Sequence, residues 1–543
     1  MDAAEQRALA REVARRRTFA IISHPDAGKT TLTEKLLLYG GAVREAGAVR
    51  AQKSARYATS DWLAIEKQRG ISVSSSVLQF EHRGCRVNLL DTPGHKDFSE
   101  DTYRTLVAAD AAVMLIDAAK GVEAQTRKLF EVCRLRHIPI FTFVNKLDRQ
   151  GREPLDLLSE IEEVLGIDAV PLNWPIGMGS DFAGVYDRQA RCARLFSGGR
   201  HGTLQVDETT VEGAPDDPAV RAALGSHAGA VRDALELLDG AGAVFDPALV
   251  AQGRQTPTFF GSALTNYGVL PFLDRFLELA PPPGPRTSTA GPIEPAAHAF
   301  SGFVFKIQAN MDPDHRDRVA FLRVCSGHFV RGESAIHVRS GKPVRLARST
   351  LLQAQEREIV DEAWPGDVVG LFDPGVFRIG DTLSAEGGFA FDGIPSFSPE
   401  HFARVEVALV LNRKALSKGL AQLSQEGVVQ LFTEPGAGTA AMILGAVGPL
   451  QFEVLQHRMQ SEYGVPLKLT PLPYQLARWA RGGFDPEEFR WSESVKIVED
   501  RDHRPVLLFR SPWNLDMTRQ KQPDLVLTET GDAPRGDEAD TDD

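Results

Sequence analysis

Short apolar runs and longer amphipathic stretches alternate over the first 150 residues of the chain. The apolar runs occupy residues 19–22, 87–90, 112–117 and 140–145, and they have the length and apolar content of buried strands. Segments long enough for a helix separate them. This alternation predicts an α/β domain with a doubly wound, mostly parallel sheet. Polar residues that follow the strands then meet at one edge of the sheet.

The pattern changes after this region, and the changes predict the domain limits. Residues 155–165 have the apolar spacing of a helix, and residues 169–255 add short strand and turn signals that we interpret as an insert. A proline-rich run at residues 281–285 suits a stiff linker. We expect a first domain over residues 1–280, a linker over 281–297, an antiparallel β-barrel over 298–385, an α+β domain over 386–526 and an acidic disordered tail over 527–543.

The α+β region has its own order of elements. Alternating or apolar runs predict strands at residues 405–411, 428–432, 442–447 and 466–469, with helices at 413–425 and 449–463. A strand, helix and strand that occur twice in succession are typical of a split βαβ domain. We attach residues 471–526 to the same domain, because Trp479, Trp491 and Trp513 supply apolar surface for packing.

Composition and charge narrow the class of protein. The chain is 43% hydrophobic and 25% charged, as in ordinary globular proteins, and no apolar run is long enough to span a membrane. Its four cysteines form no Cys-x-x-Cys pair, and its first 17 residues are basic and polar rather than a signal peptide, so we expect a cytoplasmic protein. The net charge of −12 argues against DNA as a partner and restricts any RNA contact to local basic patches. We expect a monomer with no membrane partner.

The first apolar run leads into a loop of the kind that binds phosphate. The loop and the start of the next helix read Ser23, His24, Pro25, Asp26, Ala27, Gly28, Lys29 and Thr30. Loop and helix N–H groups attract anionic oxygens, the Lys29 ammonium reaches the outer phosphates, and the Thr30 hydroxyl suits Mg²⁺. The usual pattern opens with Gly, whereas this one opens with Ser23. The alternative is an ordinary strand-to-helix turn with a chance Gly-Lys-Thr.

A second polar motif follows the strand at residues 87–90. It reads Asp91, Thr92, Pro93, Gly94 and His95. An aspartate at this strand end can hold the magnesium shell, and Gly94 allows its N–H to approach the third phosphate. The Asp-x-x-Gly spacing alone is also common in turns. Its position directly after a second predicted strand favours the nucleotide-binding interpretation.

Two further motifs predict a site for the base. After the strand at residues 140–145 come Asn145, Lys146, Leu147 and Asp148, and after residues 256–261 come Ser262, Ala263 and Leu264. The Asp148 carboxylate can accept hydrogen bonds from the N1 and N2 groups of guanine. Asn145 would bind the base edge or brace the phosphate loop, the Lys146 stem would cover a base face, and the residue 262–264 backbone would contact guanine O6. The alternative for Asp148 is a helix N-cap.

The long polar stretch between residues 39 and 80 predicts a switch. It contains Arg69-Gly70-Ile71-Ser72, and the Ser72 hydroxyl could reach Mg²⁺ and the third phosphate. A loop ordered by the third phosphate would be released after hydrolysis. The alternative is an ordinary mobile surface loop.

Together, the motifs at residues 69–72, 91–95 and 145–148 resemble those of translational GTPases. Within that family, Ser23, Ser72 and the segment at residues 445–455 are similar to the class II release factors of bacteria. The resemblance covers residues 15–525. It implies GTP and GDP as ligands with Mg²⁺ held by Thr30, Ser72 and Asp91, and catalysis by His95, which orients water, and Lys29.

The resemblance also implies partners. These are the ribosome, with its RNA and proteins, and the codon-reading release factors that the protein would eject after peptide release. Two alternatives stay open: an elongation-factor-like ribosomal GTPase acting outside termination, and a module that binds nucleotide without hydrolysing it.

Arginines are enriched in the predicted barrel, which by resemblance faces ribosomal RNA. They are Arg316, Arg318, Arg323, Arg331, Arg339, Arg345 and Arg348. Each could contact RNA, or could be a solvated charge that keeps strand edges from pairing with other sheets.

Overall fold

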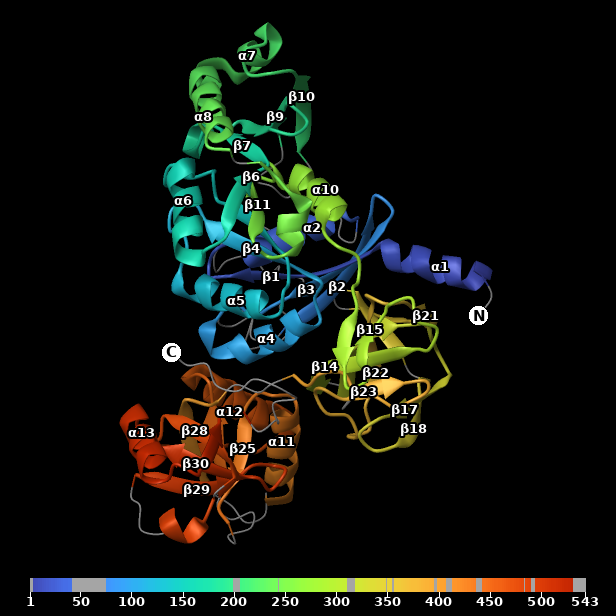
Figure 1. Cartoon of the computed structure of the whole chain (residues 1–543), viewed down its shortest axis with the longest axis vertical. Helices are drawn as coiled ribbons and strands as arrows, with labels where there is room; N and C mark the ends of the chain where they lie inside the picture. Colours follow the sequence, from blue (N-terminus) through green and yellow to red (C-terminus); the bar gives the residue numbers. More distant parts are fainter. Residues whose placement is uncertain are drawn as a thin grey trace.

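The molecule contains three packed units, each built around a sheet (Figure 1). The computed structural model describes residues 3–41, 75–198, 206–242, 244–309, 318–347, 349–353, 356–394, 398–406, 413–435, 442–482, 484–489 and 494–530. We propose that each unit is a domain, with limits near those expected from the sequence, and call them the first, second and third domain. In the described part of the chain, no helix combines the length and the apolar character needed to cross a membrane.

The first domain holds a seven-stranded sheet in the order β2-β3-β1-β4-β5-β11-β6. Only the edge pair of β2 and β3 is antiparallel among the described pairs of this sheet, so the mostly parallel sheet is confirmed. The strands are β1 (Arg16–Ser23), β2 (Ser76–His82), β3 (Cys85–Asp91), β4 (Ala111–Asp117), β5 (Ile140–Asn145), β6 (Asp168–Pro171) and β11 (Gln255–Phe260).

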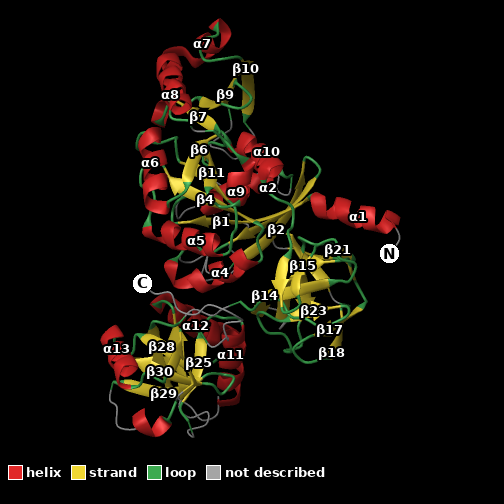
Figure 2. Ribbon diagram, viewed as in Figure 1, coloured by secondary structure: helices red, strands yellow, loops and turns green. Residues whose placement is uncertain are grey.

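Helices cover both faces of this sheet (Figure 2), which explains why its strands are continuously apolar. Phe19 and Ile21 of β1 pack on the side of α2 (Lys29–Tyr39) and α10 (Val269–Leu279). Ala20 and Ile22 face the opposite side. The helices there are α4 (Ser99–Val107), α5 (Ala124–Leu135) and α6 (Pro154–Leu165).

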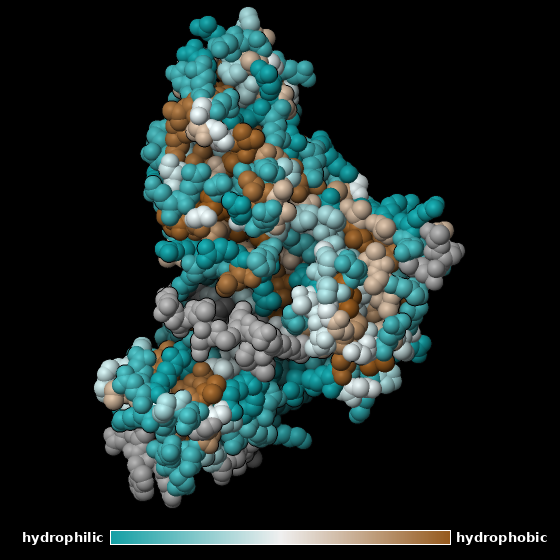
Figure 3. Space-filling model, in the orientation of Figure 1, coloured by the Kyte–Doolittle hydropathy of each residue, from teal (hydrophilic) through white to brown (hydrophobic). Residues whose placement is uncertain are grey.

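Before β1, helix α1 (Ala3–Ala14) projects away from the first domain (Figure 1). The predicted insert forms a four-stranded antiparallel sheet and helices at the far end of the domain. Hydrophilic side chains cover much of its visible surface (Figure 3). The elements are β7 (Asn173–Ile176), β8 (Gly184–Asp187), β9 (Cys192–Ser197), β10 (Asp207–Glu212), α7 (Pro218–Leu224), α8 (Ala228–Gly240) and α9 (Pro247–Ala251).

The predicted linker is only partly extended. The prolines at residues 281–285 have no regular structure, but β12 (Arg286–Ser288) and β13 (Gly291–Ile293) pair as an antiparallel hairpin. This hairpin lies within the predicted linker of residues 281–297, and Ser288 Oγ donates to Gly291 O at 2.6 Å there.

The second domain is an antiparallel sheet of eight strands that curls around an apolar core, as the predicted barrel required (Figure 1). A short pair, β16 (Phe329–Val330) and β21 (Glu362–Ala363), lies beside it. In sheet order the eight strands are β18 (Lys342–Arg345), β17 (Ser334–His337), β23 (Thr382–Ser384), β14 (Ser301–Ala309), β15 (Arg318–Ser326), β22 (Val368–Phe372), β19 (Ser349–Gln353) and β20 (Glu356–Ile359).

The arginines of this domain divide into two groups. Arg318 and Arg323 are buried, so neither of the two expected roles, solvated strand edge or RNA contact, fits them. Arg318 pairs with Asp373 at 2.6 Å, and Arg323 reaches across to Asp110 of the first domain. Both choices stay open for exposed Arg345. Arg331 and Arg339 are also exposed, and they pair with Asp361 at 2.7 Å and Asp381 at 2.6 Å. Arg316 and Arg348 lie outside the described residues.

The third domain confirms the split βαβ arrangement. Its first four strands lie in the order β27-β24-β26-β25, so the first and third lie between the fourth and second. The elements are β24 (His401–Glu406), α11 (Arg413–Gln425), β25 (Gln430–Thr433), β26 (Met442–Ala446), α12 (Pro449–Tyr463) and β27 (Lys468–Leu472). The strand expected at residues 405–411 begins earlier, and residues 407–412 lie outside the described part.

The same sheet continues through β31, near the end of the described chain, and this supports attaching residues 471–526 to this domain. Trp479 is buried, but Trp513 is 66% exposed and does not pack as expected. Trp491 lies outside the described residues, as do residues 531–543 of the tail. The tail was predicted to start one strand too early, because β31 pairs with β28. The elements after β27 in this domain include β28 (Leu476–Gly482), β29 (Val495–Glu499), β30 (Pro505–Phe509), α13 (Pro512–Lys521) and β31 (Val526–Thr528).

Candidate nucleotide-binding site

The loop from β1 to α2 has the backbone of an anion cradle. Gly28, directly before α2, has φ 101°, and a Cβ there would lie 2.4 Å from Asn145 Nδ2, so only glycine fits. No side chain caps α2, which leaves its first N–H groups for a ligand. Ser23 ends β1 and is not among the residues with positive φ. The position therefore does not need glycine's conformational freedom.

Two buried polar atoms in the same loop lack a partner within the described chain. They are Ser23 Oγ and His24 Nδ1; His24 Nε2 lies 3.3 Å from Glu123 Oε1. A buried polar group without a hydrogen bond costs about 1–3 kcal/mol. A polar ligand held in the loop would offset that cost, so these residues fit a bound phosphate group.

Lys29 and Asp91 meet at the centre of the site. Lys29 Nζ donates to Asp91 Oδ1 at 2.6 Å, and both side chains are almost fully buried. The pair forms because β1 and β3 are parallel neighbours and bring the loops at their carboxyl ends together. Thr30 is the second residue of α2 and is half-buried near the same strand ends. The third expected magnesium ligand, Ser72, lies outside the described residues, as does the whole segment 69–72.

The segment after Asp91 runs past the phosphate loop. Thr92 Oγ1 donates to Ile21 O at 2.7 Å, and a Cβ on Gly94 would lie 3.7 Å from Pro25 Cα. His95 follows with a side chain that is 33% exposed, so its imidazole can reach solvent. This places a titratable, water-accessible group beside the cradle.

Asn145 ties the phosphate side to the base side. Its Nδ2 donates to Ala27 O at 2.9 Å, and its Oδ1 accepts from Ala263 N at 2.8 Å. Of the two roles expected from the sequence, base contact and brace, the structure supports the brace. Leu147 is buried in the core, whereas Leu264 is half-buried at the surface of its loop.

Asp148 is held beside the residue 262–264 loop. Ser262 Oγ donates to Asp148 Oδ1 at 2.5 Å, and Arg149 Nε lies 3.8 Å from Oδ2. The helix N-cap alternative is wrong, because α6 begins at Pro154 and its N-cap is Glu153. The Asp148 side chain is 13% exposed, and Ser262 Oγ bonds to one of its two carboxylate oxygens.

Three family models match the chain, one for each of the three units. Residues 14–282 match the elongation factor Tu GTP binding domain, residues 299–386 match elongation factor G domain 2, and residues 391–519 match the class II release factor RF3 C-terminal domain. "Peptide chain release factor 3" of Symbiobacterium thermophilum is 58% identical over 97% of this chain and 99% of its own length. The chain belongs to the peptide chain release factor 3 family. A relative with the same name from Gloeobacter violaceus is 56% identical over 96% of this chain and 98% of its own.

A solved structure agrees on the fold. A crystal structure of a protein from Thermus thermophilus superposes with a TM-score of 0.67 over 90% of this chain and 72% of its own, at 24% identity. At that identity the likeness concerns the fold alone. The family assignment therefore depends on the sequence relatives.

Two residues that contact the candidate site were not predicted from the sequence. The first is Asp117, at the end of β4, whose Oδ2 accepts from Lys146 Nζ at 2.8 Å. Lys146 has φ 72° and also donates to Asp26 O of the phosphate loop. Asp117 therefore holds the stem expected to cover the base. The available signal was an aspartate at the carboxyl end of a parallel strand, the same signal that identified Asp91.

The pKa of Asp117 gives a test of this contact. Burial alone would raise the pKa, but hydrogen bonds from Lys146 and the Ala119 N–H hold it below its ordinary value. A depressed folded pKa contributes stability above the unfolded value of about 3.9, and that stability is lost as pH falls through the folded pKa. We expect Asp117→Asn to lower the free energy of unfolding at pH 6–7 and to differ less from wild type as pH falls below about 4. Urea unfolding of both proteins across this range checks it; a difference that does not change with pH would contradict it.

The second residue is Asp97, which joins the site to the third domain. Its backbone N–H donates to His95 Nδ1 at 3.2 Å, and its Oδ2 accepts from Leu450 N in the first turn of α12 at 2.8 Å. A Cβ on Gly448, the N-cap of α12, would lie 2.1 Å from Asp97 Cγ. Phe98 packs beside this contact on Leu450 and Val454. A carboxylate of the first domain thus caps a helix of the third.

Proposed function

We propose that this protein hydrolyses GTP when bound to the ribosome and uses the reaction to eject a codon-reading release factor after peptide release. As a member of the release factor 3 family with a translational GTPase domain, it is a GTPase of translation termination. The observation that supports hydrolysis best is the position of Gly94 and His95 beside the phosphate loop. The proposal places the protein in the cytoplasm as a monomer.

Residues on both sides of the site would hold the nucleotide. The N–H groups at residues 24–30 and the Lys29 ammonium would bind phosphate oxygens, and Asp148 with the 262–264 loop would bind guanine. Thr30, Asp91 and Ser72 would hold Mg²⁺, which neutralises charge that develops on the phosphate oxygens. Because Asn145 joins the two sides, a bound base fixes the phosphates relative to Lys29.

His95 would position the attacking water, while Lys29 supplies positive charge for the transition state. The Asp97 N–H holds His95 Nδ1, which orients the imidazole and leaves Nε2 for water. The ribosome would complete this placement. Loss of the third phosphate would free the segment around His95, and Asp97 would carry that change to α12.

Asp97→Ala tests this connection. The variant leaves the Leu450 N–H without its acceptor and removes the negative charge at the α12 N-terminus. We expect α12 to lose about 0.5–2 kcal/mol of local stability. Hydrogen exchange at the Leu450 amide should become faster, and Asp97→Asn should show a smaller effect because its amide oxygen still accepts. Asp516→Ala, at an exposed position in α13, is the control; equal exchange in all variants would contradict the connection.

GTP turnover with and without post-release ribosomes tests the hydrolysis. The proposal expects slow turnover alone and strong stimulation by ribosomes. A protein that binds GTP but shows no stimulated turnover would be the non-hydrolysing module. Stimulated turnover without any effect on release factors would point to a GTPase acting outside termination.

A further inference from the structure

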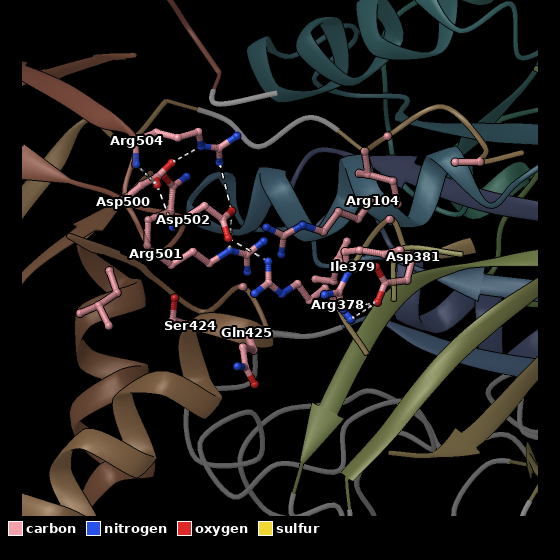
Figure 4. A pocket seen from close by; sticks show the side chains of 18 of the residues that line it. Arg104, Arg378, Ile379, Asp381, Ser424, Gln425, Asp500, Arg501, Asp502 and Arg504 are labelled. Carbon is pink, nitrogen blue, oxygen red and sulfur yellow. Dashed lines mark hydrogen bonds and ion pairs between the residues drawn. The ribbon is translucent and has the colours of Figure 1, made fainter. Parts of the chain in front are cut away.

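A cavity of 460 Å³ lies where the three domains meet, and arginines line it from every side. None of its lining residues belongs to the candidate nucleotide-binding site. Figure 4 shows the guanidinium groups of Arg104, Arg378 and Arg501 pointing toward one another across the cavity. Arg104 comes from α4 of the first domain, Arg378 from the loop before β23 of the second, and Arg501 from the turn between β29 and β30 of the third.

The carboxylates of the cavity are already committed to other groups. Asp381 accepts from Arg339 Nε at 2.6 Å and lies 2.8 Å from His337 Nε2. Asp500 accepts from Arg504 Nε at 2.7 Å and from Trp479 Nε1 at 2.9 Å.

The remaining aspartate is shared among several arginines. Asp502 Oδ1 accepts from Arg378 at 2.8 Å, while its Oδ2 lies 3.4 Å from Arg504 and 3.7 Å from Arg501 Nε. Five arginines and three aspartates line the cavity. With Glu100, which pairs with Arg104, four carboxylates face five guanidinium groups, so one positive charge is in excess.

Arg501, whose side chain is 43% exposed, is held less closely by a carboxylate than the other four arginines are. Burial, and the neighbouring guanidinium groups of Arg378 and Arg104, lower its pKa, against the opposing effect of Asp502 and Asp500. An arginine stays charged even so. The repulsion among the three guanidinium groups would be relieved by an anion between them, and phosphate matches a guanidinium with paired hydrogen bonds.

Arg104 is fixed in place for such a role. It donates to Glu100 one turn earlier on α4, and it packs so closely on Gly427 that a Cβ there would meet its Nη1. Gly427 has φ 80°, which itself favours glycine. The turn after α11 therefore confines this guanidinium at the cavity wall.

Apolar side chains complete the lining. Phe432, Ile379, Phe391 and Leu431 border the cavity beside the arginines. Its volume lies in the range of small-molecule pockets, about 300–1,000 Å³, which also combine apolar walls with a few polar groups.

We propose that this cavity binds a small organic phosphate. The phosphate would lie among Arg104, Arg378 and Arg501, and the organic part would contact the half-buried side chains of Leu431 and Ile379. A cavity of this volume suits a small molecule better than an RNA strand. The bound molecule would touch all three domains and would therefore stabilise their packed arrangement.

Calorimetric titration of the full chain tests the proposal. The protein is first saturated with GDP and Mg²⁺, so that added phosphates do not enter the candidate nucleotide-binding site. 5′-AMP is the probe, with adenosine and inorganic phosphate as separate arms. We expect saturable 1:1 binding of AMP that is tighter than binding of either part alone.

Variants locate the binding. Arg501→Gln and Arg378→Gln should each weaken AMP binding roughly tenfold, the effect of losing one charged hydrogen-bonding partner. Arg510→Gln changes an exposed arginine of the same domain and should leave AMP binding unchanged. GDP affinity should be the same in all four proteins, which shows that each variant is folded.

Three results would overturn the proposal. They are the absence of saturable AMP binding at millimolar concentration, equal binding by wild type and Arg501→Gln, and equal weakening by Arg510→Gln. A short single-stranded RNA that binds wild type but not Arg501→Gln, in a protein that does not bind AMP, would assign the cavity to RNA and also overturn it.

Discussion

Replacing His95 with Ala removes most ribosome-stimulated GTP hydrolysis and leaves GTP affinity unchanged. His95 touches the phosphate side of the site through its neighbour Gly94, and among the described residues its Nδ1 is held by the Asp97 N–H. In the part of the chain that the structure describes, its contacts are with Asp97 and Phe98 and not with the loops for the base, so we expect nucleotide binding not to need it. Losing a group that positions water costs about 10²–10⁴-fold in rate. Single-turnover hydrolysis on ribosomes, together with GTP affinity, measures both parts.

Two further variants sharpen this result. His95→Gln keeps a side chain that can hydrogen bond to water, and we expect it to retain part of the rate. His503→Ala changes a histidine that is 85% exposed in the third domain and should behave as wild type. Equal hydrolysis by His95→Ala and wild type would remove His95 from the mechanism. A loss of GTP affinity that matches the loss in rate would make its role structural.

Asp148→Asn shifts the base preference from guanine toward xanthine. An amide cannot accept two hydrogen bonds from N1 and N2 as a carboxylate does, but it can pair with the carbonyl that xanthine carries at C2. Asn still offers an oxygen to Ser262 Oγ, so the local fold survives. We expect GDP affinity to fall on the order of 100-fold, since a charged hydrogen-bond pair is lost and a polar edge is left unpaired.

The matched control is Asp168→Asn, at an exposed position of β6 in the same domain. It should leave both affinities unchanged. Competition between GDP and XDP for each protein gives the preference directly. Unchanged selectivity in Asp148→Asn would mean that another group reads the base.

The sheet of the first domain could be predicted because its strands are apolar on both faces. Phe19 and Ala20 face opposite helical layers, so the run that contains them stays apolar without alternation. The position of the candidate site could be predicted from the parallel sheet, because the carboxyl ends of neighbouring parallel strands place Lys29 and Asp91 together. Split βαβ order in the third domain followed from the succession of strand and helix signals.

The contacts that could not be predicted join residues that lie far apart in the sequence. Asp97 caps a helix that begins more than 350 residues later, and its sequence neighbours carry no sign of that helix. In the sequence, Arg323 resembles the other arginines of the predicted barrel strands. Its burial depends on its partner Asp110, which belongs to another domain. Trp513 looked like a core residue because its size favours burial, yet it lies on the outer side of α13 and is exposed.

The most direct test of the termination role is the dissociation rate of a labelled codon-reading release factor from post-release ribosomes. It is measured without this protein, with the protein and GDP, and with the protein and GTP. The account predicts strong acceleration that requires GTP and that is much weaker with His95→Ala. No acceleration with GTP, in a protein whose ribosome-stimulated hydrolysis is intact, would contradict the ejection of release factors.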